Sequence, residues 1–278
     1  MNALEIRGLT KRFPGFTLDG LDLTLPCGCI LGLIGENGAG KSTTIRLILN
    51  SLRADAGTIR VLDSDNTAIT LKERIGVVLD EAGLPGALTA EEIGKVMRLM
   101  YRQWDQDAFE KYIRLLDIPC GKKFDEFSRG NRMKLGIAVA MSHDPELLIL
   151  DEATSGLDPV VREQVVELLM DFTRQESHSV LISSHIVSDL EKLCDYIAFV
   201  HRGRLLLCEE KDVLTEQYGV VRCPAAQLAR IDPAAILHRK ETPYGAEALV
   251  LREAVPAGTE VKTLGIEELF IHMVKEAG

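Results

Sequence analysis

The chain has 278 residues, and its composition, 46% hydrophobic and 27% charged, is that of a globular protein large enough to bury its own core. The formal net charge of −10 argues against nucleic-acid binding, since the nearest basic group is the short set Arg129, Arg132 and Lys134. No apolar run approaches the roughly 20 residues that cross a bilayer, and the N-terminal residues lack the apolar core of a signal peptide. We expect a cytoplasmic protein that reaches a membrane only through a partner.

The cysteines do not form a recognisable metal or redox motif. The sequence has no CxxC pair, and the CGC at 27–29 is too closely spaced for a usual zinc site. We therefore expect reduced, structural cysteines. Their positions are Cys27, Cys29, Cys120, Cys194, Cys208 and Cys223.

Near the N-terminus, hydrophobic residues alternate with polar ones, as in half-buried strands. A short apolar run that ends in glycine, CILGLIG (29–35), predicts a buried strand, and IRLILNSL (45–52) has helical spacing. The predicted strands of this part are ALEIRGL, TLDGLDLTL, CILGLIG, GTIRVLD and RIGVVLD.

The stretch after the last of these strands is helical instead. TAEEIGKVMRLMYRQW (89–104) has helical spacing, and Thr89 with Glu92 fits a capping box. FSRGNRMKLGIAVAMSH (127–143) starts polar and continues as an amphipathic helix. We therefore predict a helical insertion over about residues 84–135.

Strands return in the second half of the chain and alternate with helices. ELLILD (146–151) and SVLISSH (179–185) are apolar runs, as expected of parallel strands that are covered on both faces. This alternation predicts an α/β fold with a mainly parallel sheet. Prolines and short strands become more frequent near the end of the chain, so we predict a main domain over 1–219 and a small α/β module over 220–278.

A glycine-rich loop carries the strongest chemical signal. GENGAGKS, residues 35–42, matches the phosphate-loop pattern G-x-x-x-x-G-K-[ST] between a predicted strand and a predicted helix. Glycines let backbone N–H groups turn onto phosphate oxygens, and the helix N-terminus adds a partial positive charge. The pattern arises by chance in about one chain in a hundred of this length, so we predict nucleotide binding. The residues assigned to the nucleotide are Gly35, Glu36, Asn37, Gly38, Ala39, Gly40, Lys41, Ser42 and Thr43.

A repeated string offers two candidate magnesium sites. LDEA occurs at 79–82 and again at 150–153, each time at the end of an apolar run. A phosphate-loop protein needs a magnesium-holding acid on a neighbouring strand. The second copy is the better candidate because its apolar run is continuous. A turn that contains Asp158 and a strand that ends at His185 follow it.

Four motifs in a fixed order resemble the ATP-binding subunit of an ABC transporter over about residues 1–215: the phosphate loop, FSRGN, LLILDEATSGLD and ISSH. FSRGN resembles the family's LSGGQ signature, and its surroundings resemble the YSKGM form of bacterial two-component ABC exporters. The resemblance implies a P-loop NTPase core with an antiparallel β part near the N-terminus. It also implies ATP and Mg²⁺ as ligands, and an Mg-dependent ATPase that powers transport, as an exporter.

For the chemical step, the resemblance implies that Asp151 ends the Walker B strand and holds Mg²⁺ together with Ser42, while Lys41 holds the phosphates. Glu152 would polarise the attacking water as general base, because a carboxylate beside a metal-bound triphosphate can orient water without being strongly basic. His185 would be the switch histidine that contacts the γ-phosphate. Its alternative is a structural histidine at the end of a strand.

Further contacts with ATP follow from the same resemblance. Phe13 falls where the family stacks an aromatic ring on adenine; its alternative is a core aromatic. Ser128 and Gly130 begin the signature helix, which would cap the γ-phosphate of ATP held by the opposite subunit. Asp158 belongs to the D-loop, which crosses the dimer interface, and with Pro159 it is also a helix-start signal.

The sequence departs from the family at three positions. Asp80, in the first LDEA, stands where the family has a glutamine that helps to ligate Mg²⁺. We predict that Asp80 serves as a metal-side ligand, since aspartate also offers a hard oxygen. The alternatives are a solvated loop start, or Glu81 as the ligand, and the Mg²⁺ dependence of alanine variants at the two positions would decide. In the signature, Arg129 replaces glycine and Asn131 replaces glutamine.

The resemblance implies two partners. A second ATP-binding subunit, either another copy or a paralogue, would complete an ATP sandwich, and a separate transmembrane permease would dock near the helical insertion and the 80–88 loop. The chain would thus be peripheral at the inner face of the cell membrane. The alternatives are a non-transport ABC ATPase, which would usually show a charged linker or coiled coils, and a regulatory module with weak hydrolysis. Glu152, Lys41 and His185 favour real hydrolysis.

Overall fold

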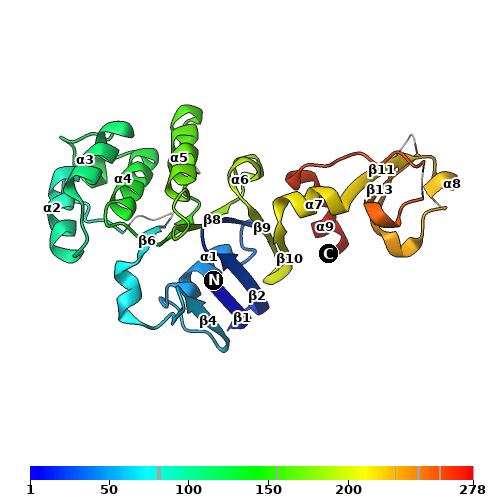
Figure 1. Ribbon diagram of the computed structural model, residues 1–278, viewed down its shortest axis with the longest axis horizontal. Coiled ribbons are helices and arrows are strands. Elements are labelled where there is room, and N and C mark those ends of the chain that lie inside the picture. The colour runs from blue at the N-terminus through cyan, green and yellow to red at the C-terminus, as the bar shows by residue number, and fades with distance from the viewer. Residues whose placement is uncertain (80–82, 155, 229, 243–244, 257, 278) are drawn as a thin grey trace.

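A mainly parallel sheet lies at the centre of the molecule (Figure 1). The computed structural model describes residues 1–79, 83–154, 156–228, 230–242, 245–256 and 258–277. The order of the central sheet is β10-β9-β3-β8-β7-β6, in which β10 runs antiparallel to β9 and the other neighbours are parallel. Its strands are β3 (Ile30–Ile34), β6 (Ile75–Val78), β7 (Leu147–Asp151), β8 (Ser179–Ser184), β9 (Tyr196–His201) and β10 (Arg204–Glu210). Every residue of β3, β7 and β8 is buried, as the apolar runs predict, so the predicted fold class is confirmed.

An antiparallel sheet packs against one face of the central sheet. Its order is β2-β1-β4-β5. The strands are β1 (Asn2–Phe13), β2 (Phe16–Pro26), β4 (Ala56–Val61) and β5 (Ser64–Asp65). Strands β1 and β2 pair so that Phe13 lies opposite Phe16 at the turn between them. Apolar side chains of both sheets and of α1 (Lys41–Ile48) form one shared core, which fixes the turn beside the loop that precedes α1.

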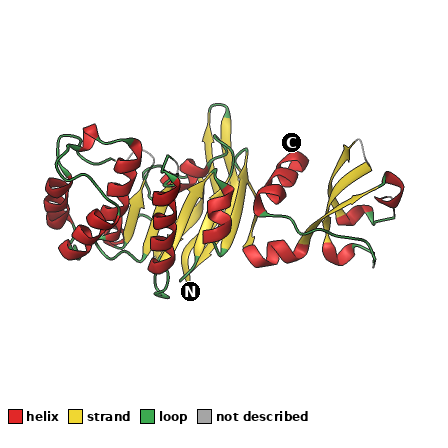
Figure 2. Ribbon diagram, turned by 90° about the horizontal axis from the view of Figure 1, so that it is seen from above, coloured by secondary structure: helices red, strands yellow, loops and turns green. Residues whose placement is uncertain are grey.

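Helices cover the other face of the central sheet. The buried apolar side chains of α4, α5 and α6 share a core with those of β3, β7 and β8. The helices on this side are α2 (Ala90–Met100), α3 (Gln106–Leu115), α4 (Arg129–Met141), α5 (Pro159–Phe172) and α6 (Val187–Leu193), with short 3₁₀ helices at Ile69–Glu73 and Phe124–Glu126. Figures 1 and 2 both place α2 and α3 at one end of the molecule. Within the ranges given above, no helix is long and apolar enough to cross a membrane.

The helix predicted through Trp104 is shorter than expected. Its N-terminus is confirmed, because the Thr89 side chain accepts a hydrogen bond in the predicted capping box. The helix ends at Met100, and Tyr101 adopts an extended conformation. The ring of Tyr101 stacks on His143, with 4.0 Å between the ring centroids. This tertiary contact overrides the helical spacing of the sequence.

The C-terminal segment forms a small sheet of its own at the opposite end of the molecule from α2 and α3 (Figure 1). Its strand order is β11-β13-β12. The elements are α7 (Lys211–Gln217), β11 (Tyr218–Cys223), α8 (Ala225–Leu228), β12 (Ile236–Thr242), β13 (Gly245–Leu251) and α9 (Ile266–Ala277), with 3₁₀ helices at Pro233–Ala235 and Arg252–Ala254. Helix α9 packs back onto α6, and the buried Ile266 and Leu269 join the main core. The division at residue 219 stays a prediction.

Candidate nucleotide-binding site

The phosphate loop leaves the carboxyl end of β3 and leads directly into α1. Gly38 and Gly40 have φ angles of 80° and 117°, a left-handed conformation that favours glycine. At Gly35 a Cβ atom would lie 2.5 Å from the carbonyl oxygen of Val200, so only glycine fits there. The side chain of Lys41 is buried, and its Nζ donates to the carbonyl oxygen of Gly35 at 2.7 Å. The glycines thus allow the loop to close around its own lysine.

Two neighbouring acids leave the carboxyl end of β7 and are fixed by a serine of β8. The hydroxyl of Ser183 donates to Asp151 Oδ1 at 2.5 Å and accepts from the backbone N–H of Glu152 at 3.1 Å. Asp151 is buried, and Glu152 has a φ of 54°, a left-handed conformation that is strained for a non-glycine residue. Ser183 was not among the site residues predicted from the sequence. Its only signal was its place at the end of the strand before His185.

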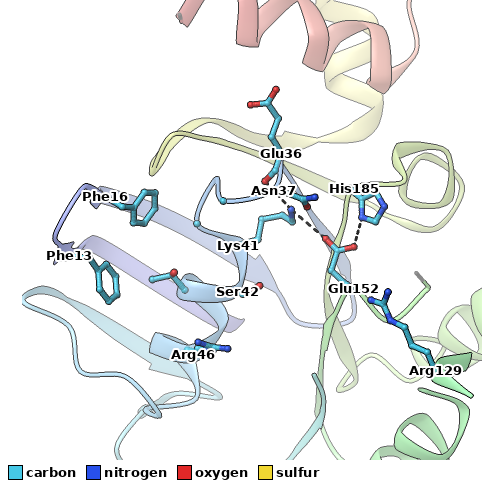
Figure 3. Close-up of a pocket in the computed structure, with 13 residues that line it drawn as sticks. Phe13, Phe16, Glu36, Asn37, Lys41, Ser42, Arg46, Arg129, Glu152 and His185 are labelled. Carbon is cyan, nitrogen blue, oxygen red and sulfur yellow. Dashed lines mark hydrogen bonds and ion pairs between the residues drawn. The ribbon is translucent and has the colours of Figure 1, made fainter. Parts of the chain in front are cut away.

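The carboxylate of Glu152 lies between a cation and an imidazole (Figure 3). Its Oε1 is 3.4 Å from Lys41 Nζ, and its Oε2 is 2.6 Å from His185 Nδ1. The structure therefore brings together the three residues that the sequence analysis assigned to catalysis. A carboxylate held at both oxygens has a defined orientation, which is the property needed to position an attacking water.

A cleft of about 720 Å³ extends from these groups to the turn between β1 and β2. The rings of Phe13 and Phe16 lie at one end, with centroids 6.3 Å apart, and Phe13 is 38% exposed, so it is not a core aromatic. Glu152 and His185 lie toward the other end (Figure 3). The cleft thus offers an aromatic surface for a base and a polar end for phosphates. Its lining residues are Phe13, Phe16, Glu36, Asn37, Gly38, Gly40, Lys41, Ser42, Thr43, Arg46, Arg129, Glu152 and His185.

Several residues that line the cleft were not predicted from the sequence to belong to the site. Phe16 and Arg46 belong to no motif, although Phe16 lies opposite Phe13 across a turn that the alternating strands already suggested. Arg129 was noted as a departure from the signature, and the structure places its side chain at the cleft (Figure 3). Its Cδ also lies close to Gly156, 3.6 Å from where a Cβ of that glycine would be.

Other predicted residues do not line this cleft. Ser128 caps α4, and its hydroxyl accepts from the backbone N–H of Asn131 at 3.3 Å. Asp158 caps α5 and accepts from the N–H groups of Val160 and Val161, both at 3.1 Å. Their helix-start roles are therefore confirmed, whereas their contacts with ATP stay predictions, as do those of Gly130. Asp80 lies outside the described residues, and its role as a metal ligand stays a prediction.

The groups that could hold Mg²⁺ are hard oxygens. Ser42 lines the cleft as the first residue after Lys41, and the buried carboxylate of Asp151 ends the neighbouring strand β7. Mg²⁺ prefers such ligands and is commonly bound by one or two carboxylates together with substrate phosphates. Within the described ranges, no group of three or more His, Cys, Asp or Glu side chains could hold a metal by itself. The residues present therefore fit a magnesium ion that arrives with a nucleotide.

Comparisons with known proteins agree with this geometry. The family model described as ABC transporter matches residues 18–155. The bacitracin transport ATP-binding protein BcrA of Enterococcus faecalis is 31% identical over 208 residues, which cover 73% of this chain and 68% of that protein. The ABC transporter ATP-binding protein YtrB of Bacillus subtilis (strain 168) is 29% identical over 283 residues, which cover 96% of this chain and 97% of that protein.

Solved structures share the fold. A dimeric ATP-binding cassette in a post-hydrolysis state, bound to ADP and Pi, superposes with a TM-score of 0.67 over 74% of this chain and 98% of that chain, at 19% sequence identity. The phosphate loop and the paired acids at the end of β7 lie within residues 18–155, which the family model matches. Taken together, the motifs, the fold and the relatives show that the chain belongs to the ABC transporter family, as an ATP-binding subunit.

Proposed function

We propose that this subunit hydrolyses ATP and thereby drives a transporter that works as an exporter. The observation that carries the proposal is the placement of Glu152, which is held between Lys41 and His185 where the phosphate loop meets the end of β7. Support for transport comes from relatives that are named for it, such as the bacitracin transport protein. Support for export comes from the signature FSRGN, which resembles the form found in bacterial two-component exporters.

In the proposed reaction, the chain binds the triphosphate with backbone N–H groups of the phosphate loop and with Lys41, while Phe13 stacks on the base. Glu152 orients the attacking water and accepts its proton. His185 contacts the Glu152 carboxylate through its Nδ1 and so restrains the rotation of that carboxylate. Mg²⁺, held by Ser42 and Asp151, would neutralise charge that develops on the phosphate oxygens. The step thus relies on positioning and electrostatics more than on covalent chemistry.

A dimer would account for predicted residues that do not line the cleft. Ser128, Gly130 and Asp158 would contact the ATP that a second subunit holds, and this chain's own cleft does not use them. The dimeric cassette with the same fold, bound to ADP and Pi, supports this arrangement. Because the nucleotide would complete the interface, dimerisation would be linked to ATP by mass action. The second subunit would be another copy or a paralogue.

A permease would dock on the side where the helical insertion meets the core. A groove of about 450 Å³ lies there, and its walls include Ile69, Leu71 and Tyr101. The side chains of Ile69, Leu99 and Met100 are largely exposed in this part of the molecule. Exposed apolar residues next to a groove are typical of an interaction site. Such a partner would place the subunit in the cytoplasm, at the inner face of the cell membrane.

The substitution Glu152→Gln tests the proposed reaction, since it removes the negative charge and retains the shape of the side chain. We expect ATP turnover, measured as phosphate release, to fall by about 100-fold or more, while ATP binding persists. Glu110→Gln, on the exposed face of α3, is the matched control and should leave turnover within about twofold of the parent. If Glu152→Gln kept turnover within a few-fold of the parent, the assigned role of this carboxylate would be wrong.

A further inference from the structure

The phosphate loop packs against the end of β9 and the turn that follows it. Strands β3 and β9 are parallel neighbours, so the loop and the turn leave the sheet at the same edge. The backbone N–H of Gly203 donates to the carbonyl oxygen of Ala39 at 2.9 Å. Val200 lies so close that a Cβ at Gly35 would be 2.5 Å from its carbonyl oxygen. The segment that contains His201 therefore helps to fix the position of the phosphate loop.

His201 is the polar end of an otherwise apolar buried strand. Residues Ile197–Val200 are fully buried, and His201 is 5% exposed. Its Nδ1 lies 3.4 Å from Oε2 of Glu36, within ion-pair distance, but without the alignment of a hydrogen bond. Neither ring nitrogen has a hydrogen-bond partner among the described residues. A buried imidazole of this kind is unfavourable if it serves packing alone, because an apolar side chain would fill the site without unsatisfied nitrogens.

The group that His201 faces is an acid inside an anion-binding loop. Glu36 is the second residue of the phosphate loop, and its side chain is 59% exposed. Figure 3 shows its carboxylate directed away from Lys41 and Glu152. If the flexible side chain turned toward the cleft, its negative charge would repel the triphosphate. The direction in which this one side chain points therefore bears on the affinity for nucleotide.

We infer that His201 is a positioning residue for nucleotide binding, which acts through Glu36. Its ring, with Nδ1 3.4 Å from Oε2, holds the Glu36 carboxylate on the outer side of the loop. The inference rests on the proposed role of the loop in binding ATP. Because His201 does not line the cleft, it should affect affinity through Glu36 and leave the chemical step unchanged.

The test compares His201→Leu in the parent and in a Glu36→Gln background. Affinity is measured with a fluorescent ATP analogue and Mg²⁺, and KM and kcat are measured by phosphate release. In the parent background, His201→Leu should weaken binding and raise KM roughly three- to tenfold, with kcat at saturating ATP within about twofold. In the Glu36→Gln background the same substitution should change affinity by less than about twofold, because no charge remains to be held. His201→Gln, which keeps an N–H donor, should restore most of the parent affinity.

A second buried histidine provides the matched control. His178 is also 5% exposed and stacks on Phe172 far along the sequence from the loop, so His178→Leu should leave nucleotide affinity unchanged. Melting temperatures identify variants that fail to fold. If His201→Leu does not fold, His201→Asn is used in its place, because the shorter asparagine amide cannot reach Glu36. An equal loss of affinity in both backgrounds, or a loss of kcat at unchanged affinity, would overturn the inference. Binding of the analogue does not require turnover. A chain that bound the analogue but did not hydrolyse ATP would therefore contradict the proposed function, while the affinity comparison would still test the role of His201.

Discussion

At the scale of single residues, one hydroxyl links the two neighbouring acids at the end of β7. Ser183 contacts the carboxylate of Asp151 and the backbone of Glu152 at once. Strand β8 supplies this serine because Asp151 and Ser183 are directly paired in the parallel register of β7 and β8. The serine thus sets the distance between the acid that would hold Mg²⁺ and the acid that would orient water.

We predict that Ser183→Ala slows hydrolysis more than it weakens nucleotide binding. Loss of the hydroxyl leaves the buried Asp151 carboxylate with one hydrogen bond fewer and removes one of the two acceptors of the Glu152 N–H, so kcat should fall by about three- to tenfold, the effect of roughly 1 kcal/mol. The Mg²⁺ concentration needed for half-maximal rate should rise.

Ser179→Ala is the matched control, since Ser179 is buried at the opposite end of the same strand and accepts from Gly28 N–H. It should alter stability without altering the Mg²⁺ requirement. If the two serine variants showed the same Mg²⁺ dependence, Ser183 would have no special role between the acids.

At the scale of elements, an ion pair aligns the starts of two parallel strands. Arg74 directly precedes β6 and Glu146 directly precedes β7. Nε of Arg74 donates to Oε1 of Glu146, and Nη2 donates to Oε2 at 2.7 Å. The backbone N–H of Glu146 donates to the carbonyl oxygen of Arg74 at 2.9 Å. Bidentate geometry makes this pair stronger than a single surface contact. It therefore helps to fix the register of β6 against β7.

The pair should make stability depend on pH. The hydrogen bonds from Arg74 lower the pKa of Glu146 below its usual value, so its charge stabilises the fold above the unfolded pKa of about 4.3, and the contribution is lost as the pH falls through the folded pKa. Glu146→Gln should cost about 0.5–1 kcal/mol at pH 7, a modest value because both side chains are 37% exposed.

Urea unfolding at several pH values checks this expectation. The difference between Glu146→Gln and the parent should shrink as the pH falls below the unfolded pKa of about 4.3, and it should vanish once the folded parent carboxylate is protonated as well. A difference that stayed constant from pH 7 to pH 3 would show that the charge of Glu146 contributes nothing.

At the scale of the whole molecule, the last helix joins the C-terminal sheet to the core. The backbone N–H of Ile266 donates to Glu191 of α6 at 3.2 Å, and the carbonyl oxygen of Glu191 accepts from Lys211 of α7 at 2.9 Å. Leu269, one turn further along α9, is 1% exposed and belongs to the same core as the helices of the central sheet. The C-terminal segment is therefore held to the core by α9 as well as by the chain connection through α7.

We predict that Leu269→Ala destabilises the whole molecule and not just its end. A cavity at a buried leucine should cost about 2–5 kcal/mol in the free energy of unfolding. Ile271→Ala, on the same helix but with 44% of the residue exposed, should cost less than about 1 kcal/mol. Urea unfolding that is followed by two probes, one in each part, should show coincident transitions. Loss of the C-terminal transition alone would mean that the two parts unfold independently.

The local signals predicted much of the fold. Continuous apolar runs placed β3, β7 and β8, and alternating ones placed β1 and β2, because burial on one or both faces is written directly into hydrophobic spacing. Capping residues gave the starts of α2, α4 and α5, because their side-chain oxygens accept from backbone N–H groups that the first turn leaves unpaired. The end of α2 was missed, since the stacking partner of Tyr101 lies far away in the chain.

The sequence by itself determined the chemistry of this protein: a phosphate loop, a pair of acids after an apolar run, and a histidine after the next strand. These motifs are local, because a loop that wraps phosphate and a strand that ends in acids are each built from consecutive residues. The tertiary structure alone decided which further side chains meet them. Phe16 and Ser183 reach the site, and His201 reaches Glu36 of the phosphate loop, because the hairpin turn and the order β9-β3-β8-β7 bring distant segments to one edge of the sheet. Hydrophobic spacing carries no record of strand order, so the sequence could suggest a turn near Phe16 and a strand end at Ser183 but not the contacts that these residues make.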